Sequence, residues 1–73
     1  TYEVTARDLS VRTGPGENFR RKTYNELTED AKKHDYDKDG CISEGTRVTV
    51  KEWSNGWARI PSGWVSGKYL RKV

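Results

Sequence analysis

The sequence predicts a mainly β domain with one helix inserted between its strands. Short segments that alternate apolar and polar residues recur near both ends of the chain, and turns rich in Gly and Pro separate them. Large rings supply much of the apolar content, since 3 Trp, 4 Tyr and 1 Phe stand among 73 residues of which 32% are hydrophobic. Disordered chains are poor in aromatic residues, and a few large rings can fill the core of a small β fold. We therefore expect a single domain over residues 1–73.

The first strands are expected before residue 16. Residues 2–6 are rich in strand-forming residues, and residues 9–12 alternate with the period of two that is typical of a half-buried strand. Residues 13–16 include Gly14, Pro15 and Gly16, which interrupt regular strand pairing. This segment is therefore expected to end in a turn.

One helix is predicted over residues 24–34. Thr23 and Glu26 have the spacing of a capping box, and Tyr24, Leu27 and Ala31 fall on one helical face. Acidic residues precede basic ones along the segment, in the order that suits the helix dipole. A helix of this length is marginal alone, so its apolar face is expected to lean on the rest of the domain.

The last third of the chain has the clearest strand pattern. Residues 47–51 alternate, and Asn55-Gly56 favours a two-residue hairpin turn before a returning strand at residues 57–60. Further short strands are expected near residues 64–65 and 68–71. The residues expected to point into the core are Val48, Val50, Ala58, Ile60 and Val65. Trp57 and Trp64 then point to the opposite face, where large rings form either a second small core or a binding surface.

Charge and composition argue against several classes of protein. The net charge of +3 comes from 14 basic and 11 acidic residues, without the concentrated basic stripe of a nucleic-acid-binding protein. No stretch approaches the ~20 apolar residues of a membrane span. Cys41 is the one cysteine, so no intramolecular disulfide is expected. Because the sequence shows no methionine and no signal peptide, we expect it to be a fragment of a longer protein.

Four blocks of the sequence resemble the bacterial SH3 domain family. They are residues 9–16 (LSVRTGPG), 45–50 (GTRVTV), 55–57 (NGW) and 63–70 (GWVSGKYL), and they occur in the order of the family pattern. The resemblance implies a small half-open SH3-like barrel of five to seven short strands. The sequence departs from the family in one place, because about twenty residues, 20–40, stand where the family has a short connection.

The resemblance also implies a function. It implies a non-catalytic module that binds peptidoglycan, or its stem or cross-bridge peptide, and targets an attached hydrolase or surface protein to the cell wall. An autolysin or endolysin with its catalytic domain in the same chain, a monomeric module, a Gram-positive source and an extracellular or wall location are the corresponding expectations. The alternative is a protein–protein module that reads extended or proline-rich peptides, with calcium as a candidate modulator.

The candidate ligand-binding residues are Arg12, Trp53, Asn55, Trp57, Trp64 and Tyr69. Aromatic faces suit sugar rings and flat peptide backbones. We therefore expect a groove floored by Trp57, Trp64 and Tyr69, with Trp53 at the hairpin rim and the inserted helix as one wall. The Arg12 guanidinium suits a stem-peptide carboxylate. Two alternatives remain open: Trp57 and Trp64 pack beneath the inserted helix, and Arg12 forms an ordinary surface salt bridge.

Residues 35–43 match the start of an EF-hand calcium loop. The candidate ligands are Asp35, Asp37, Asp39 and, through its backbone carbonyl, Cys41. Position 12 of such a loop calls for a bidentate Glu, and this chain has Thr46 there, with Glu44 two places early. The alternative is a solvated acidic turn that closes the helix, and the fold is expected to require no cofactor.

No catalytic residues are expected. His34 and Cys41 are the sole histidine and cysteine, and no third group is in place to orient them as a nucleophile and base. The chain is therefore expected not to be an enzyme by itself.

Overall fold

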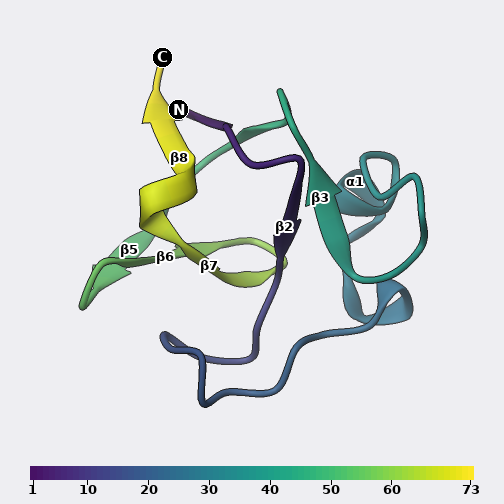
Figure 1. Cartoon of the computed structure of the whole chain (residues 1–73), viewed down its shortest axis with the longest axis horizontal. Coiled ribbons are helices and arrows are strands. Elements are labelled where there is room, and N and C mark those ends of the chain that lie inside the picture. Colours follow the sequence, from purple (N-terminus) through teal and green to yellow (C-terminus); the bar gives the residue numbers. More distant parts are fainter.

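The computed structural model describes all 73 residues and contains three small antiparallel sheets (Figure 1). The first sheet has the strand order β4 (Arg47–Val48), β1 (Tyr2–Val4), β8 (Leu70–Lys72). The second pairs β2 (Asp8–Ser10) with β3 (Cys41–Ser43). The third has the order β5 (Glu52–Ser54), β6 (Trp57–Ile60), β7 (Gly63–Ser66). The prediction of a mainly β domain is confirmed, with eight very short strands rather than five to seven.

The three sheets are joined by a few long-range main-chain contacts. The first and last strands of the chain pair with each other, so the two ends lie side by side (Figure 1), and Val73 N–H donates to Thr1 O at 3.1 Å. Beyond β2, Arg12 exchanges two main-chain hydrogen bonds with Trp64 of β7, at 2.7 and 2.9 Å. β2 and its extension are thereby attached both to β3 and to the third sheet.

One small core lies between these sheets. Its fully buried members are Val4, Leu9, Val11, Leu27, Ile42, Ala58, Ile60 and Val65. The predicted inward orientation of Ala58, Ile60 and Val65 is confirmed, while Val48 and Val50 are half-buried and pack against the core from its edge. Alternation in β6 and β7 decides this burial, because successive strand residues face opposite sides.

The predicted hairpin at Asn55-Gly56 is also confirmed. Asn55 has φ 50° and Gly56 has φ 82°, and these two residues join Ser54 of β5 to Trp57 of β6. Positive φ at both loop positions is the geometry that matches the twist of the flanking strands. Glycine and asparagine adopt it at low cost.

The predicted inserted helix is present, but it is much shorter than residues 24–34. The segment instead forms a 3-10 turn, η1 (Tyr24–Glu26), and a single α-helical turn, α1 (Glu29–Lys32), separated by extended backbone at Leu27 and Thr28. The break inserts Leu27 into the core, where it is 4% exposed. Thr28 then begins α1, its hydroxyl accepting from Ala31 N–H at 3.2 Å. Core burial of one leucine outweighs the weak preference of this segment for a continuous helix.

The inserted segment is closed by Asp35 and Gly40. The buried Asp35 carboxylate accepts from Asp39 N–H at 3.2 Å and from Gly40 N–H at 2.7 Å. Gly40 has φ 86° and packs directly against the Lys22 carbonyl, with no room for a side chain. Lys22 Nζ donates in turn to Ser62 O at 2.7 Å. Both ends of the insertion are therefore held against the rest of the domain. Separately, no helix of the chain is long and apolar enough to cross a membrane.

The closure predicts the effect of replacing Gly40. Gly40→Ala is expected to lower the free energy of unfolding by about 2–4 kcal/mol, because a Cβ would adopt an unfavourable left-handed backbone and overlap the Lys22 carbonyl. Gly45→Ala is the matched control, since Gly45 has φ 87° with open space around it, and it should lose about 1–2 kcal/mol. Urea denaturation measures both; equal losses would show that the packing against Lys22 is unimportant.

Candidate binding cleft

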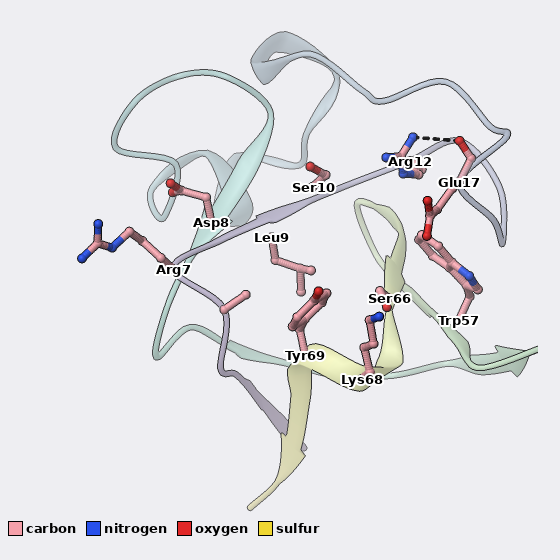
Figure 2. Close-up of a pocket in the computed structure, with 11 residues that line it drawn as sticks. Arg7, Asp8, Leu9, Ser10, Arg12, Glu17, Trp57, Ser66, Lys68 and Tyr69 are labelled. Carbon is pink, nitrogen blue, oxygen red and sulfur yellow. Dashed lines mark hydrogen bonds between the residues drawn. The ribbon is translucent and has the colours of Figure 1, made fainter.

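An open cleft of about 490 Å³ lies alongside β2 (Figure 2). Three parts of the chain line it: residues 6–10 with Arg12, Glu17 from the following turn, and Trp57 with the segment around η2 (Gly67–Tyr69). Such a volume is within the range of small-molecule and short-peptide sites. The cleft is the largest by volume of the three clefts in the structure.

Two aromatic rings border the cleft. Trp57 begins β6 directly opposite Ser66 in the β6–β7 ladder, and Tyr69 ends η2 with 40% of its surface exposed. The Lys68 ammonium lies 5.5 Å from the centroid of the Tyr69 ring, at cation–π distance. Figure 2 shows the Tyr69 ring near Leu9 and the Trp57 ring near Glu17. The cleft thus offers apolar ring surface next to cationic groups.

The Arg12 side chain is held in place by backbone carbonyls. Its Nη1 donates to Glu17 O at 3.2 Å and to Phe19 O at 3.0 Å, the first of which is drawn in Figure 2. It makes no ion pair with a carboxylate, so the surface salt bridge considered for it is not formed. A guanidinium has five N–H donors, and those on Nε and Nη2 have no partner within the chain. They remain free to hold a carboxylate in a bidentate manner.

Charges of both signs surround the cleft. Arg7, Arg12 and Lys68 are basic, and Asp8 and Glu17 are acidic. None of the ion pairs in the structure involves these five residues. Unpaired charges of both signs at an open cleft favour a ligand that itself carries both carboxylate and ammonium groups.

The structure brings together part of the predicted ligand set. Arg12, Trp57 and Tyr69 line the cleft, whereas Trp53, Asn55 and Trp64 do not. Trp53 is 48% exposed and packs edge-to-face on Tyr2, with ring centroids 5.4 Å apart. Asn55 forms the hairpin turn, and half-buried Trp64 is bonded to Arg12 through its main chain.

The inserted segment does not form a wall of this cleft, contrary to expectation. No residue between 20 and 40 lines it, because Leu27 and Thr28 direct the segment against the core and Ser62. The insertion instead lines a second, separate cleft with residues 28–34. The physical reason is the break in the helix at Leu27 and Thr28, where extended backbone changes the direction of the segment.

Sequence reasoning missed the polar lining of the cleft. Asp8, Ser10, Glu17, Ser66 and Lys68 all contribute to it. The sequence did contain a signal for Ser66. The tight turn at residues 61–62 places Ile60 opposite Gly63, and this register places Ser66 opposite Trp57. The position of Glu17 had no comparable signal in the sequence, since it depends on the hydrogen bond from the Arg12 side chain to the Glu17 carbonyl.

The candidate calcium ligands do not converge. The Asp35 carboxylate is satisfied by two backbone N–H groups, and Asp39 Oδ1 accepts from Cys41 N–H at 3.1 Å. Asp37 is exposed, and the structure has no group of three or more His, Cys, Asp or Glu side chains that could hold a metal ion. In this arrangement the residues do not fit a calcium shell. Calcium binding stays a prediction that requires Asp35 to release its N–H donors.

The thiol and the imidazole belong to different surroundings. Cys41 is buried in β3, with Sγ 3.5 Å from Ser10 Oγ and 3.6 Å from Arg21 Nη2. Cys41 lines neither the cleft beside β2 nor the cleft beside the insertion, whereas His34 lines the latter.

Comparisons with protein-family models, with curated proteins and with solved structures found no match to this chain. The resemblance to bacterial SH3 domains therefore stays a prediction that depends on the four sequence blocks. The cleft lies on segments that carry three of them, since Arg12 belongs to the first block, Trp57 to the third, and Tyr69 to the fourth.

One ion pair stabilises the turn that leads from the cleft into the insertion. Arg20 donates to both carboxylate oxygens of Glu26, at 2.9 and 2.6 Å, and Glu26 Oε1 also accepts from Thr23 N–H at 2.8 Å. The hydrogen bond from Arg20, followed by that from the Thr23 backbone, lowers the pKa of Glu26 from 4.5 to about 2. The capping box predicted from Thr23 and Glu26 is present, but it starts a 3-10 turn.

This pair predicts an acid-dependent contribution to stability. A carboxylate whose pKa is lower in the folded state stabilises the fold above its unfolded pKa, and this is lost as the pH falls from about 4.5 through about 2. Glu26→Gln is expected to lower the melting temperature at pH 7 and to match the wild type at pH 2. Glu29→Gln, which removes an exposed charge from a pair with Lys32, is the control and should cost less at pH 7. A Glu26→Gln deficit that persists unchanged at pH 2 would contradict this role.

Proposed function

We propose that this chain is a non-catalytic module that binds peptidoglycan through the cleft beside β2 and targets an attached hydrolase or surface protein to the cell wall. The observation that carries the proposal is the placement of Trp57, Tyr69 and the Arg12 fork along one open cleft. Peptidoglycan combines sugar rings with short peptides that end in carboxylates. Ring faces and a guanidinium fork are the groups that suit these two parts.

The same proposal includes a binding rather than a catalytic role for the cleft. The polar side-chain groups along it include two carboxylates, three cations, two serine hydroxyls and the Tyr69 hydroxyl, which can bind the charged and polar groups of a ligand. We infer that the ligand is held and released unchanged, and that any chemistry on the wall belongs to another domain. An extracellular or wall-associated location follows from the same proposal.

Tyr69 provides the first test of the cleft. Tyr69→Ala is expected to weaken binding to purified peptidoglycan about tenfold, because removal of the ring takes away a stacking surface. Tyr36→Ala is the matched control, since Tyr36 is 77% exposed and lies outside the cleft. Pull-down with insoluble peptidoglycan, quantified against protein concentration, gives both affinities. Equal binding by the two variants, or no binding by the wild type, would exclude the proposal.

The Arg12 fork predicts a preference within peptidoglycan fragments. Soluble fragments with free stem carboxylates are expected to bind about ten- to a hundredfold more tightly than their amidated forms, since a charged hydrogen bond is worth about 1.5–3 kcal/mol. Arg12→Lys should reduce this preference, because an ammonium cannot donate in a bidentate manner. Calorimetric titration with both fragments measures the ratio, and equal affinities for wild type would show that Arg12 reads no carboxylate.

A further inference from the structure

A second cleft, of about 260 Å³, lies between α1 and β4 and shares no residue with the first. Residues 28–34 of the insertion form one wall, and Arg47, Val48 and Thr49 form the other. The apolar side chain of Ile42 lies at its base and is 1% exposed.

The pairing of β1 decides how β4 is oriented. Val4 of β1 bonds toward the β4 side, since its N–H donates to Thr46 O and its O accepts from Gly45 N–H, each at 2.8 Å. Hydrogen bonds from one strand alternate between its two neighbours along an antiparallel sheet. Tyr2, two residues earlier, therefore also faces β4, where its partner is Val48.

The opposite edge of β4 is left open. If Val48 points its N–H and C=O toward β1, the corresponding groups of Arg47 and Thr49 point away from it. β4 is the last strand of its sheet, and neither main-chain group of Thr49 has a hydrogen-bond partner within the chain. These donors and acceptors border the second cleft, because Arg47 and Thr49 both line it.

Alternating N–H and C=O groups are the complement of an extended polypeptide. A peptide that adds as a strand obtains its affinity from such main-chain bonds and its specificity from a pocket that takes one side chain. Sugar rings lack the pairs of N–H and C=O groups that repeat at every second residue along one edge of a strand. Ala31, Ile42 and Val48 give the cleft an apolar interior of a size that suits one aliphatic side chain.

We propose that the open edge of β4 and this cleft form a second binding site, which takes an extended peptide segment of a partner protein and places one aliphatic side chain, of valine or leucine size, between α1 and β4. A second copy of this chain is a less suitable occupant, because each copy carries a net charge of +3. The site is independent of the proposed wall-binding cleft. It gives the inserted segment, which supplies one of its walls, a role of its own.

The probe is the blocked peptide acetyl-Thr-Val-Thr-Val-Thr-amide, titrated into the isotope-labelled chain and followed by amide NMR shifts. Saturable shifts are expected at Ala31, Arg47 and Thr49. The same peptide with both valine nitrogens methylated keeps its side chains but loses main-chain donors, so it should bind at least tenfold more weakly. Equal binding of the methylated peptide would overturn the proposal, as would shifts centred on Trp57 and Tyr69.

Two variants test the site from opposite walls. Thr49→Pro removes an edge N–H, and Ala31→Phe fills the cleft; each is expected to weaken peptide binding at least tenfold. A melting curve confirms that each variant is folded, and the Ala31 variant leaves the edge intact if Thr49→Pro does not fold. Both should retain wild-type binding to peptidoglycan, whereas Tyr69→Ala should retain peptide binding.

The failures of the two proposals are thereby distinguishable. If Thr49→Pro and Ala31→Phe both lose peptidoglycan binding, the two clefts act as one site, and the proposal of a separate peptide-binding site is overturned. Sedimentation of the free chain provides the remaining test, because a concentration-dependent dimer that Thr49→Pro abolishes would assign the β4 edge to a second copy instead of a partner peptide.

Discussion

The main chain at Val11 and Arg12 is the point on which the rest of this small structure depends. Val11 is fully buried, its N–H donates to Gly40 O at 3.3 Å, and its O accepts from Lys22 N–H at 2.7 Å. Arg12 is hydrogen-bonded to Trp64 through both its N–H and its C=O. Two consecutive residues thus connect β7, the start of the insertion and its end. A core of eight buried side chains is too small to hold three separate sheets by apolar contact alone, so these directional bonds set their relative positions.

The two clefts are built from different parts of the chain. The first is lined by residues from three of the four sequence blocks and by residues next to the first block, and the inserted segment contributes nothing to it. The second exists because the insertion packs against the strands through Leu27 and through the contact between the Thr28 and Ser62 hydroxyls, 3.0 Å apart. A change in the insertion can therefore alter the second surface while the first keeps its geometry. Gly40 limits such changes, since the insertion must return to the Lys22 carbonyl.

The strands, the hairpin at Asn55-Gly56 and the inward side chains could be predicted because each depends on local alternation or on turn chemistry. The helix could not, because its break at Leu27 is decided by a distant core that no local pattern describes. The same limit applies to the cleft. Trp57 and Tyr69 could be predicted as cleft residues because they are aromatic residues on strand-like segments. Glu17 could not, because it lies at the cleft only through the hydrogen bond from Arg12 to its carbonyl. The three aspartates followed a metal-loop spacing, yet Asp35 is satisfied by backbone N–H groups.

The pairing of the first and last strands has a mechanical consequence. β1 and β8 are antiparallel, and residues 1 and 73 lie at the same end of their ladder, bonded to each other (Figure 1). Tension applied to both ends of this segment would pull perpendicular to the strands and break the hydrogen bonds one after another, like a zipper, instead of shearing them all at once. The fold is thus built to yield at low force when stretched through both ends.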